Sequence, residues 1–183
     1  MAPRFDFERL AIDLSVQDLL EQRLLRSIGF GQRGGYERLW LGQAIHSRYQ
    51  ERALSEDPTY QREVHLVHSF THRGWEIRAS GRLDGLRRDL DGRRIVEEIK
   101  SVRRGTALSP LALQLYERQA LIYAWMLARR DELDAVGAEL ILIEIGGEAI
   151  DRIALDVDLE GIEREIRARV GGLIRTAEDR LAK

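Results

Sequence analysis

Two patterns of apolar residues alternate along the chain, and together they predict a mixed α/β fold. Apolar residues recur at three- and four-residue spacing in four stretches, which predicts helices over residues 15–28, 36–54, 109–130 and 159–181. Runs rich in Ile, Val and Leu between turn residues predict strands over residues 62–72, 75–87, 95–100, 138–145 and 149–158. Because a long helix precedes the strand at 138–145, a right-handed crossover should join that strand to the earlier ones in a mixed sheet.

The first predicted helix begins at Ser15, whose side chain can cap the helix together with Asp18. The stretch 29–35 that follows matches the glycine spacing G-x-G-x-x-G. A dinucleotide site requires a strand before these glycines, but a helix precedes them here, so the stretch is predicted to be a flexible loop. The sequence contains no P-loop motif either, and no nucleotide cofactor is expected.

Residues 81–104 are predicted to form a β-hairpin that carries the chemistry of the protein. The Asp91-Gly92 step supplies the positive φ that a tight strand reversal needs. Side chains alternate between the two faces of a strand, so Glu98 and Lys100 point to one face and Glu97 to the other. With Asp84 on the first strand of the hairpin, two acids and a lysine are predicted to converge.

Two carboxylates on adjacent strands offer the oxygen ligands that Mg²⁺ and Mn²⁺ prefer. Such an ion can bind a phosphate oxygen and activate water, while a lysine beside it adds a fixed positive charge. The same residues could instead form a solvated sheet face with cross-strand ion pairs. The composition of residues 95–100 favours an interior strand, where charges are uncommon without a function. Phosphodiester hydrolysis is therefore the expected chemistry.

The hairpin motifs resemble the catalytic signature of the PD-(D/E)XK nuclease superfamily. They are Gly81-Arg82-Leu83-Asp84-Gly85, without the proline of the superfamily name, and Ile95-Val96-Glu97-Glu98-Ile99-Lys100-Ser101. Within the superfamily the chain is similar to RecB-type exonuclease domains, because Gly42-Gln43-Ala44-Ile45-His46 precedes the hairpin and Gln119-Ala120-Leu121-Ile122-Tyr123 follows it. The chain has no cysteine, so the iron–sulfur cluster of some relatives cannot form.

The resemblance implies a restriction-endonuclease-like α/β core of order α-β-β-β-α-β at about residues 36–146. The helices at 15–28 and 159–181 would be additions to this core, within a single domain of 183 residues. The last helix runs to the end of the sequence, which suggests a domain excised from a longer helicase-nuclease.

The resemblance also implies roles for individual residues. Asp84, Glu98 and the Ile99 carbonyl would bind one or two Mg²⁺ or Mn²⁺ ions, and His46 would bind a second metal ion or the phosphate. The catalytic set it implies is Lys100, Asp84, Glu98, Gln119 and Tyr123, in which Gln119 and Tyr123 would hold the lysine and the DNA backbone. Glu63 would be either an additional acid of this site or an ordinary surface charge on an edge strand.

The net charge of −2 argues against general affinity for nucleic acid. Residues 82–104, however, contain eight basic and five acidic residues and so carry a local charge of +3. Arg82, Arg103 and Arg104 are the arginines expected to contact DNA phosphates, which would make binding dependent on salt. The alternative is that the hairpin arginines are ordinary solvated surface.

No stretch of about 18 apolar residues and no secretion signal occurs in the sequence, so no membrane association is expected. A cytoplasmic location is expected by resemblance alone. The expected function is a divalent-metal-dependent DNA nuclease, of exonuclease type, in DNA repair, recombination or foreign-DNA processing. The alternatives are a non-catalytic DNA-binding or assembly module of a helicase complex, and a nuclease that acts on RNA or on structured junctions.

Overall fold

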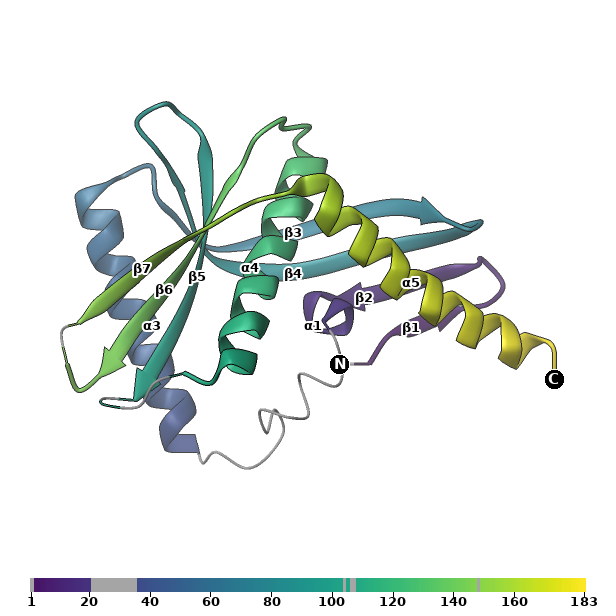
Figure 1. The fold of residues 1–183 in the computed structure, drawn as a ribbon, viewed down its shortest axis with the longest axis horizontal. Helices are drawn as coiled ribbons and strands as arrows, with labels where there is room; N and C mark the ends of the chain where they lie inside the picture. Colours follow the sequence, from purple (N-terminus) through teal and green to yellow (C-terminus); the bar gives the residue numbers. More distant parts are fainter. Residues whose placement is uncertain (1, 21–35, 104, 106–107, 148) are drawn as a thin grey trace.

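The computed structural model describes residues 2–20, 36–103, 105, 108–147 and 149–183, without the side chains of residues 36–40. The elements in chain order are β1 (Arg4–Asp6), β2 (Ala11–Ser15), α1 (Val16–Leu19), α3 (Tyr36–Glu56), β3 (Gln61–His72), β4 (Trp75–Arg88), β5 (Arg94–Arg103), α4 (Pro110–Arg130), β6 (Gly137–Ile145), β7 (Ile150–Leu155) and α5 (Leu159–Leu181). The strands form one seven-stranded sheet, with α4 and α5 on one face and α3 on the other (Figure 1). No helix in the described part of the chain has the length and apolar character needed to span a membrane.

The sheet is mixed, as predicted. The strand order is β1-β2-β4-β5-β6-β7, with β3 added to β4. β4 pairs antiparallel with β3 and β5, whereas β5 pairs parallel with β6 across the α4 connection. The predicted turn between β4 and β5 is confirmed, since Gly92 has a φ of +80°. The sequence pattern misses β1 and β2, because strands of three and five residues are too short for a reliable alternation.

The predicted helix over residues 15–28 is interrupted at Leu20. α1 begins as expected, with the Ser15 side chain accepting from the Asp18 amide in a capping box. The helix ends after four residues, because Leu20 is extended with a ψ of 153°. Val16, Leu19 and Leu20 are all buried in the main core, so tertiary packing overrides the helical periodicity. Residues 21–28 and the predicted loop at 29–35 lie outside the described residues.

One edge of β4 is shared by two strands. β3 pairs with β4 over Trp75–Leu86 along one edge. On the other edge, β2 pairs with residues 76–80 and β5 pairs with residues 85–88. Among the described strands, none pairs with residues 81–84 on that edge. Asp84 therefore lies at a fork, where β5 separates from β4.

The main core lies between the sheet and the helices α1, α4 and α5. Trp75, Ile77 and Leu83 of β4 pack in this core with Trp125 of α4, and all four side chains are buried. The other face of β5 and β6 carries a smaller cluster under α3, made of Tyr49, Ile99, Ile141 and Ile143. Because both faces are covered, the fork is flanked by helices from both layers.

The glycine beside the fork gives a test of this packing. A Cβ on Gly85 would lie 2.0 Å from the hydroxyl oxygen of the buried Tyr60, whereas a Cβ on Gly42 in α3 would meet only Ser101 Oγ at 3.5 Å. We expect Gly85→Ala to lower the free energy of unfolding by about 1–3 kcal/mol, because the added methyl overpacks the site. Gly42→Ala should raise it by about 0.5–1 kcal/mol, since glycine is unfavourable inside a helix. Urea unfolding measures both changes, and equal stabilities of the two variants would contradict the described packing.

Candidate active site

The structure brings the predicted trio together at the fork. Gly85 pairs with Glu97 across the hairpin, which places Asp84 opposite Glu98. The Ile99 amide donates a hydrogen bond of 2.7 Å to Asp84 Oδ2. On β5, Lys100 Nζ lies 2.8 Å from Glu98 Oε1. The hairpin therefore holds two carboxylates and an ammonium group in one place.

Burial sets the electrostatics of these carboxylates. Glu98 is only 2% exposed, and this burial, reinforced by the charge of Asp84, raises the pKa of Glu98 to about 7 although Lys100 opposes the rise. Burial also raises the pKa of Asp84, against the hydrogen bond from the Ile99 amide and the charge of Lys100. Burial alone would lower the pKa of Lys100, but Glu98 and Asp84 outweigh it and raise that pKa. The ammonium group therefore stays charged, while the two carboxylates lack sufficient positive charge around them.

The donor set fits a hard divalent cation in its chemistry. Asp84 Oδ1 and Glu98 Oε2 have no hydrogen-bond partner among the described residues. A divalent cation would counter the burial that raises both pKa values, because it stabilises the ionised carboxylates. Within the described ranges, however, no three His, Cys, Asp or Glu side chains are arranged to hold a metal ion. The protein thus supplies two carboxylates to an ion, and the other ligand positions would be open to water and substrate.

α4 closes one side of the site through its tyrosines. The Lys100 ammonium lies 5.0 Å from the centre of the Tyr116 ring. Tyr123 is buried, and its pKa is raised by burial and by Glu98, against hydrogen bonds with the Arg82 backbone and the Gln119 side chain. Gly81 permits this approach, because a Cβ there would lie 2.9 Å from the Tyr123 hydroxyl oxygen.

This arrangement differs from the expected roles of Gln119 and Tyr123. Both residues were expected to hold Lys100 and the DNA backbone, but in the described part of the chain the contacts of Lys100 are with Glu98 and Tyr116. Tyr123 instead binds the Arg82 backbone of β4, within the stretch 81–84 that has no strand partner on the β2 and β5 edge among the described residues, and Gln119 is its side-chain partner. Tyr116, which shares a helix face with them, is the residue that covers the lysine.

α3 brings His46 to the other side of the site. Burial lowers the pKa of the His46 imidazole, and Lys100 lowers it further, whereas Asp84 and Glu63 raise it. The imidazole is therefore neutral near pH 7 and can accept a hydrogen bond or bind a cation through a ring nitrogen. The structure thus places His46 beside Asp84, as the motif order predicts.

Gln50, one helical turn after His46, is a site residue that the sequence analysis misses. Its side chain is 2% exposed, and its Nε2 donates at 2.9 Å to both the Asp84 carbonyl oxygen and Glu63 Oε1. Glu63 lies on β3 opposite Asp84 of β4, at a position where the regular pairing of the two strands is interrupted. Its φ is +53°. Gln50 therefore satisfies a carbonyl that the interrupted ladder leaves free. The four-residue spacing between His46 and Gln50 could have indicated this role from the sequence, because it places both side chains on the same face of a helix.

Glu63 belongs to the surroundings of the site. Its second carboxylate oxygen pairs with Arg82 Nε at 2.8 Å, and its side chain is 40% exposed. Its charge acts on His46, Asp84 and Glu98. Of the two interpretations of Glu63, the geometry favours a place beside the site over an isolated surface charge.

The predicted arginine patch is largely neutralised by carboxylates. Arg82 pairs with Glu63, and the other paired arginines of the hairpin are Arg87 with Glu97 and Glu139, Arg93 with Asp89, and Arg94 with Asp131. Among the hairpin arginines that the structure describes, Arg88 and Arg103 have no carboxylate partner. Arg104 lies outside the described residues. The local charge of +3 therefore overstates the charge available to a ligand.

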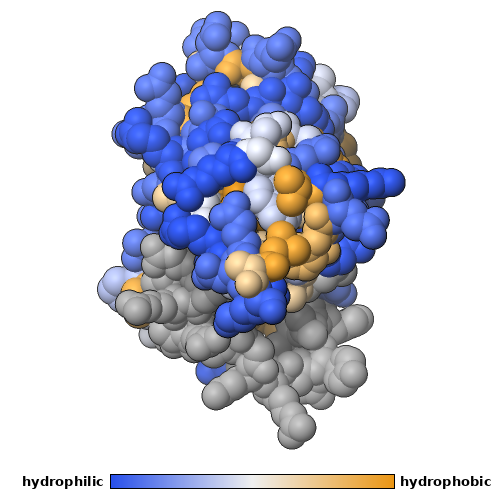
Figure 2. All heavy atoms as spheres, turned by 90° about the vertical axis from the view of Figure 1, so that its right-hand side faces the viewer, coloured by the Kyte–Doolittle hydropathy of each residue, from blue (hydrophilic) through white to orange (hydrophobic). Residues whose placement is uncertain are grey.

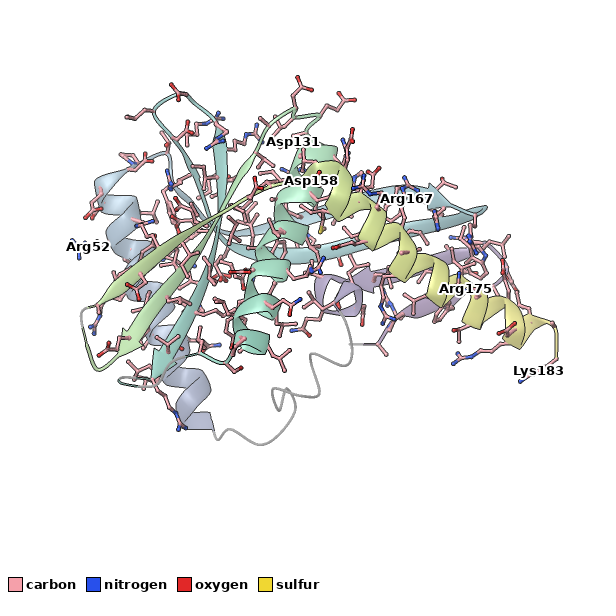
Figure 3. The ribbon with its side chains drawn as sticks, in the orientation of Figure 1. Arg52, Asp131, Asp158, Arg167, Arg175 and Lys183 are labelled. Carbon is pink, nitrogen blue, oxygen red and sulfur yellow. The ribbon has the colours of Figure 1, made fainter. Side chains whose placement is uncertain are left out.

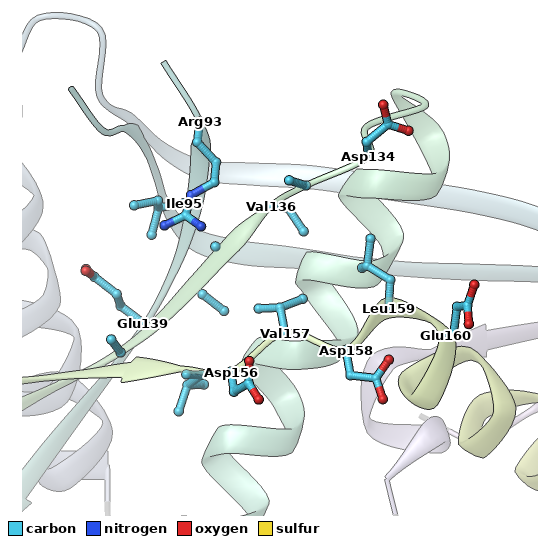
Figure 4. Close-up of a pocket in the computed structure, with 15 residues that line it drawn as sticks. Arg93, Ile95, Asp134, Val136, Glu139, Asp156, Val157, Asp158, Leu159 and Glu160 are labelled. Atoms are coloured by element: carbon cyan, nitrogen blue, oxygen red, sulfur yellow. The ribbon is translucent and has the colours of Figure 1, made fainter. Parts of the chain in front are cut away.

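A cavity of about 370 Å³ lies away from the fork, where β6, β7 and the start of α5 meet (Figure 4). Its acidic lining residues are Asp134, Glu139, Asp156, Asp158 and Glu160, with Arg93 as the basic one. Such a lining repels a nucleic-acid phosphate. The cavity is therefore not part of the candidate site.

Several solved structures share this fold, and three of them illustrate the similarity. SSO0001 has a TM-score of 0.58 and 23% identity, over 86% of this chain and 75% of that one. A Eubacterium rectale protein assigned as an exonuclease has a TM-score of 0.57 and 10% identity, over 88% and 79%. The alkaline exonuclease LHK-Exo from Laribacter hongkongensis has a TM-score of 0.54 and 17% identity, over 93% of both chains.

These similarities confirm the predicted fold class, a central mixed sheet flanked by helices. No protein-family model matches the sequence, and no curated protein is significantly similar to it.

The raised pKa of Glu98 predicts a pH dependence of stability. The folded protein retains a proton on Glu98 up to about pH 7, whereas an ordinary glutamate releases it near 4.5. The free energy of unfolding should therefore fall as the pH rises between these values, on the order of 2–3 kcal/mol in metal-free buffer. Urea unfolding at a series of pH values should show this fall for the wild type and for Glu51→Gln, an exposed control, and a smaller fall for Glu98→Gln, in which the raised pKa of Asp84 still contributes. A fall of the same size in Glu98→Gln would contradict the assignment.

The position of Asp84 should depend on Gln50. Gln50→Met removes the amide donor at similar size, and Tyr49→Phe is the matched control, because Tyr49 donates to the buried Glu97 from the neighbouring position of α3. Each variant should lose about 1–2 kcal/mol of stability. Hydrogen exchange should show reduced protection of the Ile99 amide, the donor to Asp84, in Gln50→Met alone. The same loss of protection in both variants would refute a specific role of Gln50.

Proposed function

We propose that the protein is a divalent-metal-dependent deoxyribonuclease of RecB type. The observation that carries the proposal is the fork itself, where the half-buried Asp84 and the buried Glu98 meet Lys100 at the point where β5 leaves β4. The shared fold of two proteins named as exonucleases supports nuclease chemistry.

Asp84, Glu98 and the Ile99 carbonyl would hold Mg²⁺ or Mn²⁺. When bound, the ion would bind a phosphate oxygen and lower the pKa of the attacking water. Ile99 would thus act through both of its backbone groups, because its amide already fixes Asp84 Oδ2. This keeps the Asp84 carboxylate oriented before the substrate arrives.

Lys100 is the residue that acts directly on the reacting phosphate. Glu98 and the Tyr116 ring hold its ammonium group in place, and its raised pKa keeps it charged. From this position Lys100 would orient the attacking water and stabilise the negative charge that develops on the phosphate oxygens. His46, neutral beside Asp84, would contact the phosphate or contribute to a second metal site. Tyr123, with Gln119 as its partner, would hold α4 against the Arg82 backbone of β4 and so keep α4 in position beside the site.

The substrate would be DNA, degraded from its ends in repair, recombination or the processing of foreign DNA in the cytoplasm, with a helicase domain or subunit as a partner. Arg82 and Arg103, together with Arg104, would contact the phosphodiester backbone. Arg82 would have to exchange its contact with Glu63 for one with a phosphate, whereas Arg103 is exposed without an ion-pair partner among the described residues. Because few arginines are available, binding should be weak and should weaken further with salt.

Removing the Lys100 ammonium group tests the proposal. Lys100→Ala should reduce cleavage of end-labelled linear DNA in Mg²⁺ or Mn²⁺ by about 10²–10³-fold, because it removes the fixed charge that stabilises the transition state. Lys183→Ala is the matched control, since Lys183 is the other lysine of the sequence and is exposed. Asp84→Asn should abolish both the cleavage and the increase in melting temperature that Mn²⁺ causes in the wild type.

The products and the substrate choice separate the alternatives. Mononucleotides or short fragments released from the labelled end indicate exonuclease action, and internal fragments indicate endonuclease action. Faster cleavage of a matched RNA would favour the RNA nuclease. If the wild type binds DNA in a salt-sensitive manner without cutting it, the protein is a binding or assembly module. Unchanged cleavage by Lys100→Ala would refute the proposed mechanism.

A further inference from the structure

Three hydrogen-bond donors converge above a glycine of α5, at the end of β4 remote from the fork. The point that a Cβ of Gly171 would occupy lies 3.4 Å from His72 Nε2, 3.7 Å from Arg175 Nη1 and 4.0 Å from Arg73 Cζ. His72 is the last residue of β3 and Arg73 lies in the β3–β4 turn, whereas Arg175 follows Gly171 by one turn of α5. We call this group, consisting of His72, Arg73, Gly171 and Arg175, the Gly171 cradle.

The hydrogen-bonding state of His72 follows from its other neighbour. Arg167 Nη1 lies 3.3 Å from His72 Nδ1, and a guanidinium group can only donate, so Nδ1 is the acceptor. Burial lowers the pKa of His72, as do the charges of Arg167 and Arg73, so the imidazole is neutral. Its single proton is therefore on Nε2, the atom that faces the cradle. All three groups of the cradle are consequently donors.

The cradle also lacks a counter-charge. Neither Arg73 nor Arg175 has a carboxylate partner among the described residues. The nearby Arg167 contacts Glu163 only at 3.8 Å, and that carboxylate is already bound by Arg129 at 3.0 Å. Figure 3 shows Arg167 and Arg175 on α5 beside the β3–β4 hairpin. Like charges held this close repel one another unless an anion lies between them.

Local conformational preferences are violated here as well. Arg73 has a φ of +50° and Gly74 a φ of +79°, a turn in which Asn or Gly is favoured at both positions. The neighbouring Gly171 and Gly172 lie inside α5, where each costs about 1 kcal/mol relative to alanine. A Cβ at Gly171 would make ordinary van der Waals contacts, so packing does not require the glycine. Such departures from local preference are typical of functional sites.

We propose that the Gly171 cradle binds a phosphate group through His72 Nε2, Arg73 and Arg175. The phosphate could be free inorganic phosphate or a phosphodiester of a nucleic-acid backbone, since both present the same oxygens to the donors. Asp84 lies nine positions after Trp75 on β4, roughly 30 Å at 3.3 Å per residue, so the cradle is not part of the catalytic site. Figure 2 views the molecule from this end, where hydrophilic side chains predominate around a small apolar patch.

The test is a titration of the whole protein with inorganic phosphate, with chloride at equal ionic strength as the reference, because added salt alone weakens electrostatic contacts. The His72 ring and Gly171 amide signals, followed by nuclear magnetic resonance, should shift with phosphate and not with chloride. Arg73→Asn and Arg175→Gln should each weaken binding by about tenfold or more. Asparagine tolerates the positive φ at residue 73, so that variant retains the turn.

Two further variants distinguish a site from general charge. Arg180→Gln removes the same charge from the exposed end of α5 and should leave phosphate binding unchanged. Gly171→Ala keeps all three donors but fills the space between them, and it should weaken binding while the melting temperature stays the same or rises. Equal weakening by Arg180→Gln and Arg175→Gln would overturn the proposal.

A second titration with a short DNA duplex identifies the source of the phosphate. Shifts of the same signals with DNA, reduced in Arg73→Asn, would assign the cradle to a nucleic-acid backbone. Shifts with inorganic phosphate alone would assign it to free phosphate. The absence of specific shifts in both titrations would overturn the proposal, and none of these outcomes depends on nuclease activity.

Discussion

The candidate site depends on a gap in strand pairing. β2 and β5 pair with the same edge of β4 at residues 76–80 and 85–88, and the backbone between them has no strand partner among the described elements. Unpaired backbone groups must find other partners when they are buried. Tyr123 meets this need at Arg82. Gln50 meets a second need on the other edge of β4, where the pairing with β3 is interrupted at Glu63 and leaves the Asp84 carbonyl free. Polar side chains from both helical layers therefore complete the backbone hydrogen bonds around the site.

The chemistry of the site follows from the burial of charge in that gap. Removal from water raises the pKa values of Asp84 and Glu98, and the charge of Lys100 offsets this rise only in part. In the proposed function, a divalent cation would supply the missing positive charge, and together with Lys100 it would stabilise the charge that develops during phosphodiester hydrolysis. The same burial keeps His46 neutral. Burial, rather than any one contact, therefore gives these ordinary side chains properties suited to catalysis.

The opposite face of the hairpin shows how its geometry is stabilised. Glu97 is 1% exposed and accepts hydrogen bonds from Tyr49 at 3.0 Å and Arg152 at 3.1 Å, with Arg87 Nε at 3.4 Å. This network ties α3, β4, β5 and β7 together directly behind Glu98. Removing one partner of such a network would leave a buried charge uncompensated. The arginines that looked available for DNA in the sequence are therefore partly structural, whereas those at the Gly171 cradle have no carboxylate partner in the described chain.

The sequence by itself determined the strands of the hairpin, its turn at Gly92, and the convergence of Asp84, Glu98 and Lys100, because strand alternation and turn chemistry are local properties. The early end of α1, the strands β1 and β2, the pairing of the arginines and the roles of Gln50, Tyr116 and Tyr123 were decided only by tertiary structure. Each of these depends on a partner far away in the chain. A local pattern specifies which face a side chain occupies, but the residue that it meets there is fixed by long-range packing and strand register.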